Sequence, residues 1–322
     1  MNKLFSSLTL GSAIALTAAG QAKIPRMPDG HPSFAGLWTD RTLTPLERRK
    51  ELGTKEFYTD EEFAKMSAML SQGKLPEGFA PPRTGGETSV QYNQELYGYD
   101  PTKLPVASTK RTSLIVGPEG RIPPMLPEAI KRNADRAAKL KGHEADSYKN
   151  RSLSERCIVG GLVALPMIPS ASDQNTHFQI AQGRGYVGIY QEEFHDTRLI
   201  PTDGRPHIPQ NIRQYQGDSA GHWEGDTLVI DTTNFTDRTA FRGSSEQLHL
   251  VERLTRISDD TILYRFTVED PKTWDKPWTA EIPWTKNNQP LFEYACQEGN
   301  SDLPSILAGA RAEEAEAAKK KQ

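Results

Sequence analysis

The chain has 322 residues, with 39 Lys and Arg against 42 Asp and Glu and a formal net charge of −3 at pH 7. This balance provides no basic face for wrapping a nucleic-acid backbone, so we expect no nucleic-acid partner. With 36% hydrophobic and 8% aromatic residues, the composition is that of a folded protein and not of a disordered chain. The 23 prolines and 25 glycines favour a loop-rich β protein over a helical bundle.

Residues 1–22 are predicted to be a secretory signal peptide. Lys3 supplies a positive charge, an apolar run follows from Leu4 to Ala19, and Gly20-Gln21-Ala22 offers small residues at a cleavage site. The run is shorter than the ~20 residues that a membrane-spanning helix needs, so a retained anchor is the less favoured alternative. We therefore expect a periplasmic or secreted protein without membrane association after cleavage.

The rest of the chain holds two cysteines, Cys157 and Cys296. In an oxidising compartment, two cysteines far apart in the sequence most often form one disulfide. A catalytic thiol is the alternative, but neither cysteine lies in a CxxC or zinc-type spacing. The sequence therefore predicts a disulfide bond that closes a loop of about 140 residues.

Residues 23–150 are predicted to form an irregular arm with short helices that pack on the rest of the protein. Gly36–Thr39 is typical of a short strand, and Thr59–Met69 predicts a helix with a threonine cap and an acidic first turn. Arg111–Val116 predicts a strand, and Pro127–Leu140 a helix with proline in its first turn. Nothing in this arm points to catalysis.

From about residue 174, apolar residues recur with a period of two, which is typical of β-strands. Turn signals such as Gly183-Arg184-Gly185 and Asp203-Gly204 separate the strands, and such short connections favour antiparallel hairpins. About eight strands are predicted, at Thr176–Gln182, Tyr186–Phe194, Thr197–Thr202, Gly221–Thr233, Leu248–Ile257, Thr261–Val268, Thr279–Thr285 and Leu291–Cys296.

We therefore predict a mainly β domain over residues 151–303. Its strands would form an antiparallel up-and-down barrel of lipocalin-like size, with a two-sheet β-sandwich as the alternative. Residues 304–322, rich in Ala, Glu and Lys, predict a C-terminal helix that ends in a charged tail.

Alternation within two predicted strands places ionisable side chains among apolar ones. Glu252 shares a face with Leu250 and Leu254, while His249 and Arg253 lie on the opposite face of that strand. In the strand that begins at Tyr186, Glu193 and His195 would share a face with Val187 and Ile189, and Tyr190 would lie on the other face. A buried charge must be paired or have a perturbed pKa, which is the mark of a functional site or of a structural ion pair.

The densest polar region lies between residues 191 and 226, and several motifs in and around it form a recognisable set. They are Gly36–Thr39, Thr44–Arg48, Glu193–Asp196, Asp203–His207, Gly217–Ser219, Trp223–Val229, Leu248–Arg253, Asp270-Pro271 and Tyr294–Asn300. With these motifs the chain resembles a large family of soil-bacterial proteins that carry a secretory signal and have no established activity. A histidine is usual in that family where this chain has Gln297, which argues against a catalytic or ligand role for that position. The resemblance implies one secreted unit and supplies no reaction.

The preferred interpretation of the polar residues is metal-free acid–base catalysis on a small organic molecule held in a polar pocket of the barrel. Histidine and glutamate would move protons, as a lyase, isomerase or hydrolase requires, and an arginine would hold an anionic oxygen. The expected catalytic residues are His195, His249, Glu193, Glu252 and Arg253. The expected substrate-binding residues are Arg198, His207, Arg213, Tyr190 and Trp223.

Two other interpretations stay open. The first is a divalent-metal site with His195, His207 and His249 as ligands; no HxH or HExxH spacing supports it, so no cofactor is predicted. The second is a non-catalytic, lipocalin-like barrel that binds a small molecule. Ser219 is a possible nucleophile, but the small residues of Gly217–Gly221 predict a turn, so a serine hydrolase is not favoured. The sequence does not determine the substrate or the oligomeric state.

Overall fold

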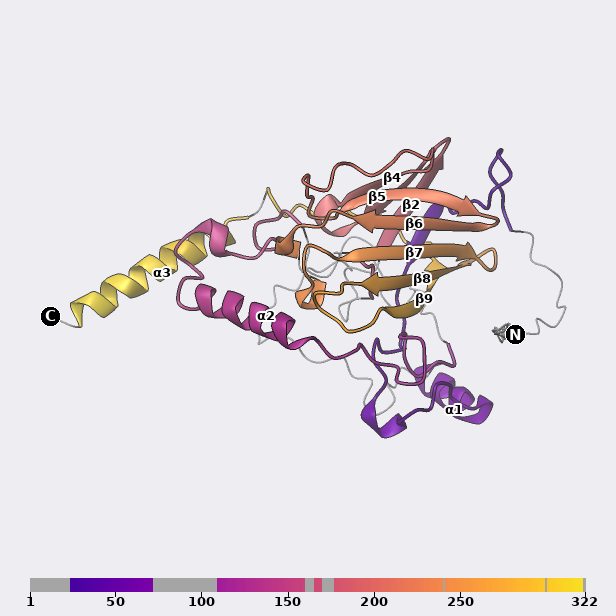
Figure 1. Cartoon of the computed structure of the whole chain (residues 1–322), viewed down its shortest axis with the longest axis horizontal. Helices are drawn as coiled ribbons and strands as arrows, with labels where there is room; N and C mark the ends of the chain where they lie inside the picture. The colour runs from indigo at the N-terminus through magenta and orange to yellow at the C-terminus, as the bar shows by residue number, and fades with distance from the viewer. Residues whose placement is uncertain are drawn as a thin grey trace, which may run out of the picture.

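The computed structural model describes residues 24–71, 109–159, 165–169, 177–239, 241–298 and 300–320; the predicted signal peptide lies outside them. Nine strands form one sheet in the order β4-β3-β2-β1-β9-β8-β7-β6-β5, which curls into a nearly closed barrel (Figure 1). The strands are β1 Gly36–Thr39, β2 His177–Gly183, β3 Tyr186–Gln191, β4 Thr197–Pro201, β5 Asp218–Glu224, β6 Thr227–Thr233, β7 His249–Arg256, β8 Thr261–Glu269 and β9 Trp278–Lys286. The prediction of a mainly β, up-and-down barrel is confirmed, and the sandwich alternative is not adopted.

Three of the eight strands predicted after residue 174 differ from the structure. The segment predicted as one strand, Gly221–Thr233, is the hairpin of β5 and β6, with Gly225 at the turn in a left-handed conformation of φ 61°. The strand that begins at Tyr186 ends at Gln191, because Phe194 has φ 61° and a short 3-10 turn follows. Leu291–Cys296 forms no strand and runs as an irregular segment.

The two ends of the sheet meet without forming a hairpin. Neighbouring strands are antiparallel at all eight hydrogen-bonded junctions, so β4 and β5, at the ends of the order, run in the same direction. Parallel neighbours need a crossover, and residues 202–217 return from the end of β4 to the start of β5. Side chains close this seam: Arg198 Nε donates to Ser219 Oγ at 2.9 Å, and a Cβ on Gly221 would lie 3.0 Å from Ile200.

Inward-facing aromatic side chains fill the barrel, as expected where only the alternate residues of each strand reach the interior. Trp284 stacks on Tyr264 with ring centroids 4.3 Å apart, and the edge of Phe178 meets Trp284 at 4.6 Å. Trp38 from β1 is fully buried beside them. The core of the protein is therefore the inside of the barrel.

The helices lie outside the barrel (Figure 1). They are α1 Asp60–Ser71, α2 Pro127–Leu140 and α3 Asp302–Lys319, close to the predicted ranges. Thr59 and Glu62 form the capping box of α1, with Glu62 N donating to Thr59 Oγ1 at 3.2 Å. Among the described residues, no helix has the length and apolar character needed to cross a membrane.

The segment predicted as a strand at Arg111–Val116 instead makes one isolated β-bridge with β9, between Ile115 and Ala280. Val116 N donates to Thr279 O, and Glu281 N donates to Leu114 O, both at 2.9 Å. Because β1 pairs only with the last residues of β9, this segment covers part of the edge that β1 leaves open. The arm is thus partly built into the wall of the barrel.

A disulfide bond joins Cys157 and Cys296, with 5.7 Å between their Cα atoms. It ties the segment that precedes β2 to the irregular segment that follows β9. The predicted pairing is confirmed, and the alternative of a free catalytic thiol is wrong because both cysteines are bonded.

A buried carboxyl group at the end of β1 makes the stability of the fold depend on pH. Asp40 is 4% exposed, and burial raises its pKa from 3.8 to about 8. Between about pH 4 and pH 8 the unfolded chain releases this proton while the folded protein keeps it, so folding becomes less favourable as the pH rises. We expect Asp40→Asn to remove this loss. The difference in unfolding free energy between the variant and wild type should shift in favour of the variant by about 2–5 kcal/mol from pH 4 to pH 8. Urea unfolding at the two pH values measures the difference; equal effects at both would show that Asp40 is ionised in the fold.

Candidate functional site

Five side chains at one end of the barrel alternate as carboxylate and imidazole: Asp218, His207, Asp231, His249 and Glu269. His207 contacts Asp218 through Nδ1 at 2.7 Å and Asp231 through Nε2 at 2.9 Å. His249 contacts the second oxygen of Asp231 through Nε2 at 2.6 Å and Glu269 through Nδ1 at 3.2 Å. We call this set the acid–histidine chain.

The strand pattern explains how these residues meet on the outer wall. Asp231 points outward because its neighbours Ile230 and Thr232 are buried. His249, the first residue of β7, is paired with Glu269, the last residue of β8. Their side chains therefore lie side by side at the rim, one strand away from Asp231.

His207 is the one member of the acid–histidine chain that lies in the crossover between β4 and β5. Its neighbour Ile208 donates its backbone N–H to Asp218 Oδ2 at 3.1 Å, so Asp218 holds both residues. Asn234, just after β6, donates its side-chain amide to the carbonyl oxygens of Ile208, Pro209 and Ile212. The crossover is thus fixed against the end of the barrel by two different strands.

The contacts within the acid–histidine chain favour the charged forms of Asp231 and His249. A hydrogen bond and the charge of Asp231 raise the pKa of His249 above its ordinary value, although partial burial opposes the shift. Burial by itself would raise the pKa of Asp231, but the hydrogen bonds and charges of His249 and His207 outweigh it and hold that pKa below its ordinary value. The side chains of Asp231 and His249 are 35% and 33% exposed, so solvent reaches the pair. The pair can therefore exchange protons with a molecule at the surface.

A second polar cluster lies inside the barrel. Glu252 is fully buried and is bound by Arg198, whose Nη1 donates to Oε1 at 2.9 Å and whose Nη2 donates to Oε2. Tyr264 donates its hydroxyl to Glu252 at 2.8 Å, and Arg198 also donates to Ser219 and Thr232. The prediction that the inward face of β7 carries an ionisable group is confirmed, and this group is satisfied by an ion pair.

This interior cluster leaves almost no space for a ligand. The cavity beside it measures about 10 Å³, which is about the room that one water molecule needs. It is lined by Leu165, Met167, Ile189, Gln191, Asp196, Arg198 and Gln216. Ser219 lies on a strand and not in the predicted turn, and its hydroxyl is bound by Arg198, so it has no nucleophile geometry.

The other residues expected to be catalytic lie apart from both clusters. His195 and Glu193 are in the 3-10 turn after β3, where the backbone N–H of Tyr294 donates to His195 Nε2 at 3.3 Å. Arg253 is on the outer wall and donates to Glu224 at 2.6 Å. The catalytic residues expected in one barrel pocket are therefore distributed over the interior, the rim and the outer surface.

The expected substrate-binding residues are also dispersed. Arg213 donates to the carbonyl oxygens of Phe235 and Glu246. Trp223 stacks on His31, with ring centroids 4.3 Å apart, and Tyr190 lies on the outer face of β3. Of the expected site residues, the structure brings together His207 with His249 through Asp231, and Arg198 with Glu252.

The expected metal ligands are not gathered into one site. Within the described ranges, no three or more His, Cys, Asp or Glu side chains have a geometry that could hold a metal ion. His207 and His249 direct their ring nitrogens at carboxylate oxygens, and His195 lies in the separate turn after β3. The residues present do not fit the three-histidine interpretation.

The sequence analysis missed three members of the acid–histidine chain, Asp218, Asp231 and Glu269. Alternation alone did not indicate a functional role for Asp231, since an outward carboxylate on a half-buried strand is usually solvated. The available signals were the registers of two hairpins: β7 with β8 places Glu269 beside His249, and β5 with β6 places Asp218 on the same face as Asp231 and diagonal to it. The partner of His207 depends on the crossover, for which the sequence offers no comparable rule.

Comparison of the chain with protein-family models, with curated proteins and with solved structures found no match. The resemblance to signal-bearing soil-bacterial proteins therefore stays a prediction. Any function must be argued from the geometry of the acid–histidine chain and of the surfaces around it.

Proposed function

We propose that the protein is a secreted enzyme that transfers protons on a small organic molecule, with His249 as the general acid–base group. The observation that carries this proposal is that the two ring nitrogens of His249 have unequal contacts. Asp231 holds Nε2 at 2.6 Å, whereas Nδ1 lies 3.2 Å from Glu269, whose side chain is 44% exposed. A substrate that displaces Glu269 would meet Nδ1 while Asp231 keeps the ring oriented.

The chemistry of this pair suits a proton donor. Because contact with Asp231 raises the pKa of His249, the imidazolium form persists to higher pH than in a free histidine. It would donate the Nδ1 proton to the substrate, and Asp231 would stabilise the imidazolium before transfer. Glu269, next to the same nitrogen, would accept a proton from the substrate or from water. A donor and an acceptor at one position suit lyase, isomerase or hydrolase chemistry.

The proposed location agrees with the disulfide of Cys157 and Cys296, which is typical of oxidising compartments outside the cytoplasm. The lipocalin-like binding function has less support. It needs an open interior, but core side chains fill the barrel beside a cavity of only about 10 Å³. We therefore place the reaction on the outer rim of the barrel and not inside it.

We expect His249→Gln to lower kcat by about 10²–10⁴-fold with only a small loss of Tm, because it removes the proton-transferring group while the lost ion pair with Asp231 is partly exposed. The assay is NMR detection of deuterium uptake or product formation, in D₂O, over a panel of small hydroxy acids, keto acids and esters. His222→Gln is the matched control. His222 is exposed on the same outer face, and within the described residues its one ion pair is with Glu224. Full turnover by His249→Gln would disprove the assignment.

Asp231→Asn tests Asp231 as a positioning residue. The amide has no charge to hold the imidazolium, so the pKa of His249 should fall toward its ordinary value. For a reaction that needs His249 protonated, the rate falls as the pH rises through this pKa, and the fall should begin at lower pH in the variant. A pH profile of kcat that is unchanged in Asp231→Asn would contradict this role.

A further inference from the structure

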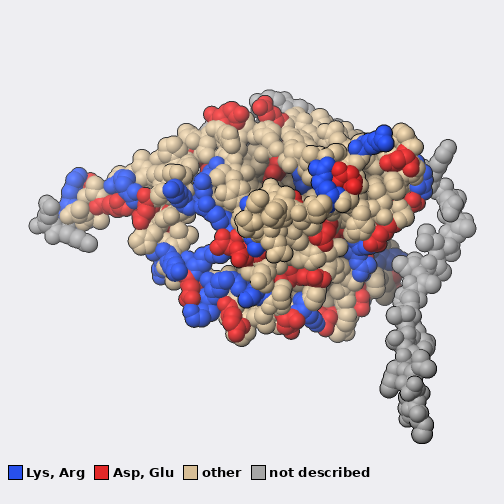
Figure 2. All heavy atoms as spheres, turned by 45° about the horizontal axis from the view of Figure 1, so that its top comes forward, with Lys and Arg blue, Asp and Glu red and all other residues tan. Residues whose placement is uncertain are grey.

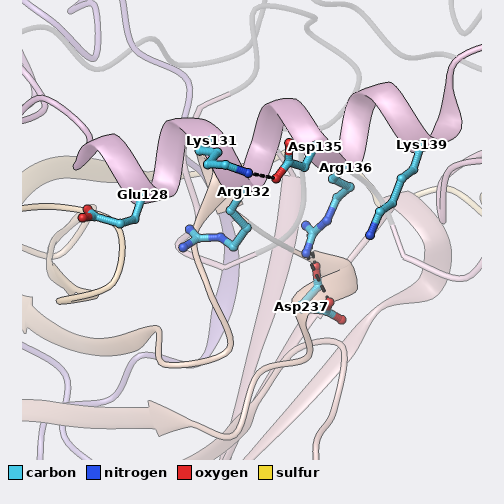
Figure 3. A pocket seen from close by; sticks show the side chains of 7 residues that line it. All are labelled: Glu128, Lys131, Arg132, Asp135, Arg136, Lys139 and Asp237. Atoms are coloured by element: carbon cyan, nitrogen blue, oxygen red, sulfur yellow. Dashed lines mark hydrogen bonds and ion pairs between the residues drawn. The ribbon is translucent and has the colours of Figure 1, made fainter.

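An open cleft of about 600 Å³ lies between α2 and the short turn that begins at Asp237 (Figure 3). Its volume is in the range of small-molecule binding sites. It is lined by Glu128, Lys131, Arg132, Asp135, Arg136, Lys139 and Asp237, so every lining residue is charged. No residue of the acid–histidine chain belongs to it.

The charges follow from the sequence of α2. Its lining residues recur at intervals of three and four, which places them on one face of the helix. Lys and Arg side chains gather on this side of the molecule, near the C-terminal helix (Figure 2). Ala129 is the only residue of α2 that is buried, and Arg132, Asn133 and Arg136 join the helix to loops of the barrel by hydrogen bonds.

Two of the four cations in the cleft are neutralised and two are not. Lys131 pairs with Asp135 at 2.6 Å, and Arg136 pairs with Asp237 at 3.1 Å. Arg132 instead donates to neutral acceptors, and within the described residues no carboxylate forms an ion pair with Lys139. These two cations are seven residues apart, about 10 Å along the helix axis.

Arg132 is fixed in position by its neutral acceptors. Nη1 donates to the carbonyl oxygen of Lys272 at 3.0 Å, and Nη2 donates to the carbonyl oxygen of Gly243 and to Thr273 Oγ1. Asp270 ties together the two loops that carry these acceptors, since it accepts from Ser245 and from Thr273. The buried Nε and one N–H of Nη1 have no acceptor among the described residues, on a guanidinium that lines the cleft.

We propose that this cleft binds an acidic oligosaccharide, with carboxylate groups of the sugar at Arg132 and Lys139. Glu128, Asp135 and Asp237 would accept hydrogen bonds from sugar hydroxyl groups. A polyphosphate offers no hydroxyl donors to the three carboxylates, and a neutral sugar would leave the two cations without partners. The alternation of cations and carboxylates therefore selects a ligand that has both negative charges and hydroxyl groups.

Isothermal titration of the mature protein with tetragalacturonate, at low and at physiological salt, tests the proposal. We expect binding that weakens with salt, because the contacts are exposed ion pairs. Lys139→Glu should weaken it at least 5-fold, while Lys65→Glu, the same charge reversal at an exposed site on α1, should leave it unchanged. His249→Gln should bind as wild type does, so a failure of the proposed catalysis would not affect this result.

Maltotetraose, which is neutral, and tripolyphosphate, which has no hydroxyl donors of this kind, are the comparison ligands. Weaker binding of both than of tetragalacturonate supports the proposal. Absence of tetragalacturonate binding, equal binding of maltotetraose, tighter binding of tripolyphosphate, or equal effects of the two lysine variants would each overturn it.

Discussion

Replacing Arg198 by methionine is expected to lower the free energy of unfolding by about 3–5 kcal/mol, because it leaves the carboxylate of Glu252 buried without its cation. Glu252 on β7 has no exposed surface, and Arg198 contacts both of its oxygens from β4, six strands away in the sheet order. The same substitution removes the donor that joins β4 to Ser219 across the seam. Urea unfolding followed by tryptophan fluorescence measures the change.

The double variant Arg198→Met with Glu252→Leu is the control. Exchanging a whole buried ion pair for apolar residues of similar volume is often neutral, so the double variant should regain most of the stability lost in either single variant. Two single effects that simply add in the double variant would show that the pair is not coupled. A loss below about 1 kcal/mol in Arg198→Met would show that water or another group replaces the guanidinium.

Removing the disulfide is expected to lower the free energy of unfolding by about 4–5 kcal/mol, since Cys157 and Cys296 are separated by 139 positions and the bond restricts a long loop of the unfolded chain. The double variant Cys157→Ser with Cys296→Ser avoids the side effects of a single free thiol. Thermal and urea unfolding of wild type, with and without reductant, provide the comparison.

Reduced wild type should unfold like the double serine variant, and oxidised wild type should be more stable than both. Equal stability of all three forms would contradict the prediction. A double variant that retains the barrel but loses protection from hydrogen exchange only near residues 291–298 would show that the bond holds the local segment and not the whole fold.

The local sequence pattern predicted most of the strands but not the way in which the sheet closes. Alternation and turn residues gave β7, β8 and β9 almost to the residue. The pattern failed at Leu291–Cys296, where alternation continues but no neighbouring strand is available to accept its hydrogen bonds. It also could not place β1 between β2 and β9, because more than a hundred residues separate β1 from both partners and a local pattern contains no register between them.

The candidate site shows the same division between local and distant information. Alternation predicted that an ionisable group would face the core of β7, and Glu252 does. It could not identify Arg198 as the partner, because that contact depends on the closure of the barrel. His249 was recognised from its sequence neighbourhood, but Asp231 acquires its importance only when β6 and β7 are paired in the observed register.

The odd number of strands explains the position of His207. In a closed cylinder, an even count of strands allows every neighbouring pair to be antiparallel, so that strands that follow one another along the chain can be joined by tight turns. Nine strands leave one pair that runs in the same direction, so the chain must travel the length of the barrel again before β5 can begin. His207 lies on that return path and reaches Asp218 and Asp231 from outside the sheet. The parity of the strand count is thus the geometric origin of the second imidazole beside Asp231.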